Sequence, residues 1–221
     1  MIKLERTSVM NWENAIRGAR NPMNSWEKRD TRPCPEAGTE QCGYMEKCDF
    51  GCCFEIGPND LSLLMRLRNA GPDERKFMRQ IFVSVDITAP LYWWKEFDTY
   101  KVGTVANSCS TMHKIHAKEF TLDDFSHEHL LDPIVLAVLN PLITCLNAQR
   151  KYFIETKDKK HWWQMIQLLP TSYNQLRTVT LNYEVLTNMY HARKNHKLDE
   201  WHDFCHWIES LPYSQLIVGE Q

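Results

Sequence analysis

The sequence predicts an α+β fold in which helices predominate over a few strands. Residues 80–87 alternate polar with apolar, mostly β-branched side chains, and Ile81, Val83, Val85 and Ile87 share one face of a strand. Apolar residues recur with helical spacing through most of the chain after Asp132. No repeat or low-complexity tract interrupts this mixture, so we expect packed helices with a small sheet.

The first half of the chain begins with a predicted strand at residues 1–8, where apolar and polar side chains alternate. A short helix follows at residues 11–20, and Asn11 stands where an N-cap is expected. A second helix is predicted at residues 60–70, with Asp60 as its cap.

Residues 21–59 are rich in Pro, Gly, Cys and charged residues and predict a long irregular segment, with a hairpin near residues 50–56. Five cysteines lie there: Cys34, Cys42, Cys48, Cys52 and Cys53. Their spacing does not match the paired C-x2-C knuckles of structural zinc sites. Because the N-terminus lacks the apolar core of a signal peptide, we expect reduced thiols rather than disulfides.

The second half is expected to be largely helical. Pro90 suits the first turn of a helix that follows the strand. Further helices are predicted at residues 132–156, 160–169, 183–194 and 198–211. Pro141 is expected to kink or break the first of these. Residues 176–181 fit either a strand or the start of a helix.

Composition narrows the classes of function. The chain has 221 residues, 43% of them hydrophobic, which suits one large domain or two small ones. The formal net charge is -2, so there is no broad basic surface for a nucleic acid polymer. No apolar run reaches membrane-spanning length. These features favour a soluble, cytoplasmic protein.

Generic catalytic motifs are weak in this chain. His202 and His206 lie at helical i, i+4 spacing and resemble a metalloprotease pair, but no third ligand is evident and helix-packing histidines are the simpler interpretation. We therefore predict no metal site. Cys109 or Ser110 could act as a nucleophile, although the sequence places no base beside either.

The densest mixture of aromatic and polar residues lies in residues 79–113. Lys95, Glu96 and Lys101 stand there among the aromatic residues around Trp93 and Trp94. The tryptophans are expected in the core, or else in an aromatic wall that would suit a flavin or a base. This segment predicts the wall of a pocket.

The same segment resembles the flavin-dependent thymidylate synthases, the ThyX family. Their motif reads Q-x-x-R-H-R-x-x-S-x-N-E-x-S-x-R-Y. Laid on it without gaps, Glu96 takes the Gln position, Thr104 the first Ser, and Cys109 the second Ser. A one-residue shift after Thr104 instead aligns Asn107 and Ser110 with the Asn and the second Ser.

A second resemblance lies in residues 168–201. The family has Leu-Pro, then an Asn in an N-x-R motif, then an Arg. Leu169-Pro170, Asn182, Asn188 and Arg193 fall at similar spacings. With the opening strand and helix, the resemblance spans most of the chain. It implies a single ThyX-like domain over residues 1–221, with a Cys-rich insert at about 31–57 and a small, mostly antiparallel sheet flanked by helices.

Several charged positions of the family motif are changed here. Its first and third Arg become Thr99 and Lys101, its Glu becomes Asn107, and its last Arg becomes Thr111. The remaining changes fall at Ile166 and Glu184, where the family has Arg, and at Arg79-Gln80, where it has a Glu-His pair. Thr or Ile cannot replace the bidentate phosphate contacts of Arg.

The resemblance implies an enzyme that methylates dUMP at C5. Methylenetetrahydrofolate supplies the carbon, NADPH reduces FAD, and the reduced flavin supplies the hydride. The expected assembly is a homotetramer. By resemblance, the flavin contacts fall on Arg79, Lys101, Asn182 and Asn188. The nucleotide contacts fall on Lys95, Glu96, Thr104, Asn107, Cys109 and Ser110, and the catalytic role on Arg193.

Two other functions stay open at this point. A ThyX-like flavoprotein could act on another pyrimidine nucleotide, since the phosphate and base positions are altered. A non-catalytic member could bind a nucleotide or a protein partner. Asn182 and Asn188 could equally hydrogen-bond locally around a helix start.

Overall fold

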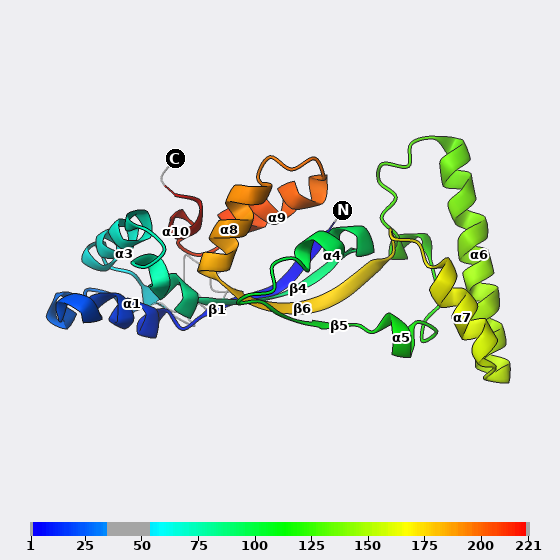
Figure 1. The fold of residues 1–221 in the computed structure, drawn as a ribbon, viewed down its shortest axis with the longest axis horizontal. Coiled ribbons are helices and arrows are strands. Elements are labelled where there is room, and N and C mark those ends of the chain that lie inside the picture. The colour runs from blue at the N-terminus through cyan, green and yellow to red at the C-terminus, as the bar shows by residue number, and fades with distance from the viewer. Residues whose placement is uncertain (1, 35–53, 220–221) are drawn as a thin grey trace. The chain divides into compact units, whose positions relative to one another are not determined.

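The computed structural model describes residues 2–34 and 54–219 (Figure 1). It confirms the predicted α+β class. A four-stranded antiparallel sheet has the order β1-β4-β6-β5. Its strands are β1 (Lys3–Met10), β4 (Phe82–Pro90), β5 (Val105–Ser108) and β6 (Asn174–Asn182). The ambiguous residues 176–181 therefore belong to a strand. Two short strands, β2 (Arg32–Pro33) and β3 (Phe54–Glu55), pair antiparallel.

The helices follow the predicted order with small shifts at their ends. The α-helices are α1 (Trp12–Arg20), α3 (Pro58–Ala70), α4 (Leu91–Phe97), α5 (Thr111–Lys114), α6 (Pro133–Thr156), α7 (Lys159–Leu168), α8 (Tyr183–Arg193), α9 (Asp199–Ser210) and α10 (Gln215–Val218). Short 3-10 helices are η1 (Asn21–Met23), η2 (Trp26–Lys28), η3 (Arg75–Gln80) and η4 (Leu122–Asp124). Among the described helices, none combines the length and apolar character needed to cross a bilayer.

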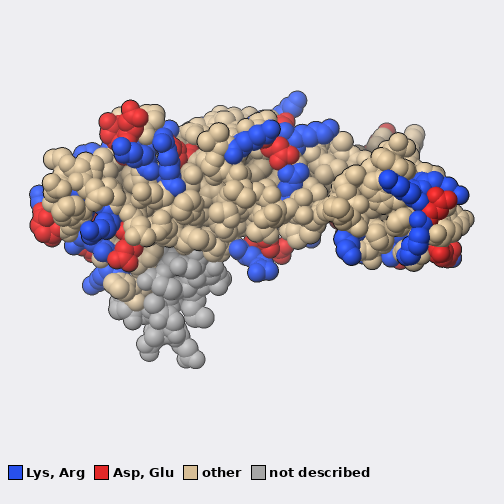
Figure 2. Space-filling model, turned by 60° about the horizontal axis from the view of Figure 1, so that its bottom comes forward, with Lys and Arg blue, Asp and Glu red and all other residues tan. Residues whose placement is uncertain are grey.

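The chain forms two compact units. Unit 1 comprises Met1–Lys3, Ile87–Thr99 and Asn107–Arg177, and unit 2 comprises Leu4–Asp86, Tyr100–Ala106 and Thr178–Gln221. On the surface in view, Lys and Arg side chains are interspersed with Asp and Glu, without one large field of a single sign (Figure 2).

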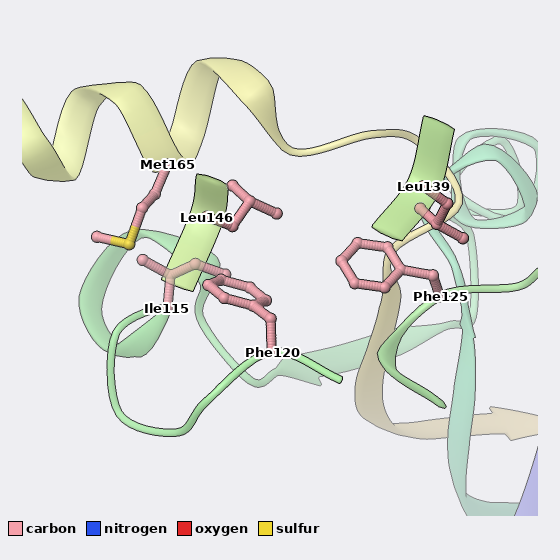
Figure 3. Close-up of a cluster of buried hydrophobic side chains, with 6 residues drawn as sticks. All are labelled: Ile115, Phe120, Phe125, Leu139, Leu146 and Met165. Carbon is pink, nitrogen blue, oxygen red and sulfur yellow. The ribbon is translucent and has the colours of Figure 1, made fainter. Parts of the chain in front are cut away.

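Unit 1 has an apolar core built on α6 and α7 (Figure 3). Its buried side chains are Ile115, Phe120, Phe125, Leu139, Leu146 and Met165. The long helix α6 begins after Asp132, whose carboxylate accepts a hydrogen bond from the Ile134 N–H at 2.8 Å. The helix continues through Pro141, so the expected break is absent.

Unit 2 buries the apolar face of β4 that the alternation predicted. Ile81, Val83 and Val85 are almost wholly inaccessible to solvent there. Asn11 precedes α1 as predicted, but its side chain makes no cap hydrogen bond. Its amide instead donates to the Gln80 carbonyl at 2.8 Å, so the residue ties α1 to η3.

The predicted cap role of Asp60 is wrong. Helix α3 begins at Pro58 with Gly57 as its N-cap residue, which places Asp60 inside the first turn. There the buried carboxylate accepts a hydrogen bond from Arg20 Nε at 2.6 Å and another from the Thr31 N–H at 2.8 Å. A long-range ion pair decides this position, and sequence spacing carries no sign of it.

Candidate functional site

Unit 1 brings together two of the segments that carry the predicted nucleotide contacts. Lys95 and Glu96 lie on α4, and Asn107, Cys109 and Ser110 lie where β5 leads into α5. Both segments hydrogen-bond to the start of β6. Their approach therefore depends on a strand whose residues were not among the predicted site residues.

Gln175 makes the connection on β6. Its carbonyl accepts a hydrogen bond from Trp94 Nε1 at 3.0 Å, and its side-chain Nε2 donates to the Cys109 carbonyl at 2.9 Å. The Cys109 N–H donates to the Leu176 carbonyl at 2.9 Å. The N–H and the carbonyl of Cys109 are therefore both hydrogen-bonded, while the residue as a whole is exposed to solvent.

Arg177 is the main residue of this region that the motif comparison did not indicate. Its Nε donates to Gln175 Oε1 at 3.0 Å, and its Nη1 donates to Asp98 Oδ1 at 2.7 Å. The guanidinium carbon lies 4.1 Å from the centre of the Trp94 ring. A long basic side chain inside a strand was the available signal, because such a side chain needs a partner if it is not fully solvated.

Ser110 is occupied as a helix cap. Its hydroxyl accepts a hydrogen bond from the His113 N–H at 3.1 Å at the start of α5. This contact orients the turn after Cys109 but gives the hydroxyl no basic side chain that would activate it as a nucleophile.

Unit 2 places the segment around Lys101 beside the start of α8. A Cβ on Gly103 would lie 3.0 Å from Asn182 Nδ2 and 3.1 Å from Val185 Cγ2, and Gly103 has φ +75°. A side chain at this position would therefore be strained and crowded. The buried Thr104 hydroxyl oxygen has no hydrogen-bond partner within the described residues.

Asn182 and Asn188 occupy different environments on unit 2. Asn182 is buried and caps α8, because its Oδ1 accepts a hydrogen bond from the Val185 N–H at 3.0 Å. This is the local helix-start contact considered above. Its amide nitrogen faces Gly103 and is not used in that cap. Asn188 is exposed on the same helix.

Arg79 and Glu184, two positions at which the chain departs from the ThyX motif, contact each other directly. Arg79 Nε donates to Glu184 Oε2, and Arg79 Nη2 lies 3.3 Å from Oε1. Arg75 adds a contact at 3.4 Å. Burial alone would raise the pKa of Glu184, but the hydrogen bonds and charges of Arg79 and Arg75 lower it overall.

Arg193 packs against two aromatic rings of unit 2. Its Nε donates to the Tyr100 hydroxyl at 2.9 Å. Its guanidinium carbon lies 5.5 Å from the Tyr100 ring centre and 4.7 Å from that of Trp201. The side chain therefore fixes the end of α8 to the segment that begins at Tyr100.

The remaining candidate features are the predicted histidine pair, the tryptophans, the Cys-rich insert and a surface pocket. His202 contacts Asp199 at 3.6 Å, and the described part of the chain contains no group of three or more His, Cys, Asp or Glu that could hold a metal. Trp93 and Trp94 are buried, whereas Trp163 is exposed. Most of the Cys-rich insert lies outside the described residues. A surface pocket of about 440 Å³ on α6 contains none of the predicted site residues.

Comparison with solved structures identifies the fold. The chain is similar to thymidylate synthase X (ThyX) from Helicobacter pylori with FAD and dUMP, with a TM-score of 0.67 and 15% identity over 99% of this chain and 98% of that chain. A second H. pylori ThyX structure, complexed with FAD and dUMP, matches with a TM-score of 0.65 and 15% identity over 97% and 98%. No protein-family model matches, and no curated protein sequence matches.

Proposed function

We propose that this protein is a divergent FAD-dependent thymidylate synthase-like enzyme that methylates dUMP at C5. The observation that carries the proposal is the nearly complete match, in both directions, to a protein solved with FAD and dUMP. A fold alone does not fix a function. The proposal therefore also rests on where the two units place the residues of the ThyX motif.

The residues of unit 2 suit a flavin near the start of α8. Among the described residues, the buried Thr104 hydroxyl has no hydrogen-bond partner. The amide nitrogen of Asn182 lies beside Gly103, which has no side chain to crowd it. Lys101 and Asn188 are exposed nearby in the chain. We assign FAD to Lys101, Asn182, Asn188 and Arg79. The Arg79 side chain is bound by Glu184, which lies two residues after Asn182. When bound, FAD supplies the hydride, after reduction by NADPH.

The residues of unit 1 suit orientation of a nucleotide. Lys95 provides positive charge on α4, and the fixed backbone of Cys109 with the capped turn at Ser110 provides a rigid edge. Glu96 and Asn107 add a carboxylate and an amide. The predicted nucleotide contact Thr104 and the predicted catalytic residue Arg193 lie instead in unit 2. No protein nucleophile is required, so the work of these residues is positioning and electrostatic stabilisation.

A ThyX-like flavoprotein acting on another pyrimidine nucleotide is the second candidate. Glu184 favours it, because the ThyX motif has an arginine at this position. In this chain the position is buried and negatively charged, and two arginines are its partners. Arg75 and Arg79 are thus committed to a carboxylate and carry less charge toward a ligand.

Three measurements test these proposals. A purified protein that is yellow, or that takes up added FAD, supports both enzyme functions, and a protein that stays colourless contradicts both and favours a non-catalytic member. Release of tritium from C5-labelled dUMP, with methylenetetrahydrofolate, FAD and NADPH present, supports thymidylate synthesis. Bound FAD without tritium release favours the other nucleotide. Sedimentation velocity tests the proposed homotetramer.

A further inference from the structure

We propose that Arg177 is the phosphate-binding residue of the nucleotide site, and that the phosphate displaces Asp98 as the ion-pair partner of its guanidinium. This inference rests on the proposed function for the identity of the nucleotide. It concerns a residue outside the ThyX motif, and it follows from the contacts that Arg177 makes in unit 1.

The guanidinium of Arg177 is held in place but not saturated. Among the described residues, its Nε donates to Gln175 and its Nη1 donates to Asp98. Both N–H groups of Nη2 donate to none of the described residues. The guanidinium carbon lies 4.1 Å from the centre of the Trp94 ring, a cation–π contact that helps to hold the group in place. An oriented guanidinium with unused donors is the group that binds a phosphate through two parallel hydrogen bonds.

Asp98 is suited to be displaced rather than to be permanent. It contacts Arg177 through one carboxylate oxygen, and its side chain is 51% exposed, against 16% for Arg177. An ion pair with one exposed partner and a single contact is more easily broken than a fully buried one. A phosphate dianion carries more charge than a carboxylate and offers more acceptor oxygens. It should therefore compete effectively for the same donors.

The hydrogen bonds of Gln175 connect this guanidinium to the nucleotide segment. The same side chain accepts from Arg177 through Oε1 and donates to the Cys109 carbonyl through Nε2. The Gln175 side chain therefore links Arg177 to Cys109. Ser110, the N-cap residue of α5, directly follows Cys109. The motif arginines are absent from this chain at Thr111 and Ile166, and Arg177 supplies a guanidinium in the same unit.

Isothermal titration with dUMP, deoxyuridine and inorganic phosphate tests the inference. Arg177→Gln should weaken dUMP binding about tenfold or more, because it removes a charge-assisted hydrogen bond to the phosphate. The affinity for deoxyuridine, which has no phosphate, should stay unchanged. Arg177→Lys should recover part of the loss. Asp98→Asn should tighten dUMP about two- to fivefold, because it removes the competing carboxylate. Arg150→Gln, a half-buried arginine of the same unit that bonds a carbonyl, is the matched control and should have no effect.

A purely structural brace would give the opposite pattern. Equal loss of dUMP and deoxyuridine binding in Arg177→Gln, or unchanged or weaker dUMP binding in Asp98→Asn, overturns the inference. Asp98→Asn alters an exposed partner, so it remains informative even if Arg177→Gln unfolds. If the wild-type protein binds phosphate through Arg177 but does not bind dUMP, the anion site stands and the proposed function fails.

Discussion

At the scale of single residues, the buried pair Arg20–Asp60 should be one of the most sensitive positions. Both side chains are almost fully buried and joined at 2.6 Å. Asp60→Asn would leave the guanidinium without a counter-charge, so we expect a loss of about 3 kcal/mol in the free energy of unfolding. Urea denaturation checks this. Asp123→Asn, which alters an exposed carboxylate, should change little.

The same carboxylate should make stability depend on acid. Burial would raise the pKa of Asp60, but hydrogen bonds from Thr31 and Arg20 lower it overall. A depressed pKa contributes stability above the unfolded-state value, and this stability is lost as the pH falls through the folded-state value. We expect wild-type stability to fall between about pH 4 and the lower folded pKa, and Asp60→Asn to fall less there. Equal slopes in the two proteins would contradict this.

Arg79 and Glu184 show how two departures from a motif can compensate each other. Each looks like a lost functional charge when read alone, yet they form one ion pair in the fold. Arg79→Glu or Glu184→Arg alone should destabilise the protein, since each places like charges together. The double variant restores the charges that the ThyX motif has at these positions. We expect it to be more stable than the sum of the single effects, by about 1 kcal/mol or more.

The FAD affinity of that double variant is a second readout. If these positions bear on the flavin, it should bind FAD more tightly than wild type, because an arginine again stands two residues after Asn182. A double variant that regains stability without any gain in FAD affinity would restrict the pair to a structural role. Thermal unfolding and flavin fluorescence titration measure the two effects separately.

At the scale of elements, helix α6 carries a correctable defect. Pro141 lies inside the helix, is exposed, and lacks the N–H that would bond the carbonyl one turn earlier. Pro141→Ala should therefore stabilise the protein by about 1 to 3 kcal/mol. Pro133→Ala is the matched control, because Pro133 stands in the first turn, where no such bond is lost. A destabilised Pro141→Ala protein in urea denaturation would show that the proline is needed.

Elements were more predictable than the contacts between them. The alternation in residues 80–87 and the helical periodicity after Asp132 are local signals, and they gave strands and helices close to those observed. Asp60 was misassigned because its partner Arg20 is distant in sequence. Arg177 was missed for the same reason, since its partner Trp94 lies on α4 and its partner Asp98 directly follows that helix. Periodicity reports which face is buried but not which polar side chains meet.

At the scale of the whole molecule, the predicted site residues divide between the two units. Most of the predicted nucleotide contacts lie in unit 1, and the predicted flavin contacts lie in unit 2. The motif comparison could not reveal this division, because residues 99–111 are continuous in sequence while the chain passes from one unit to the other and back. Each ligand should therefore leave its own local signature.

Hydrogen–deuterium exchange should separate those signatures. We expect dUMP to slow amide exchange at residues 107–111 and in the first half of β6, because it would contact unit 1. We expect FAD to slow exchange at residues 100–104 and at the start of α8. Helix α7, which contains no predicted contact, serves as the internal control at short exchange times. Ligand binding that favours only the folded state protects slowly exchanging amides throughout the chain, which is why short exchange times are compared. At those times, uniform protection, or protection of the same residues by both ligands, would contradict this assignment.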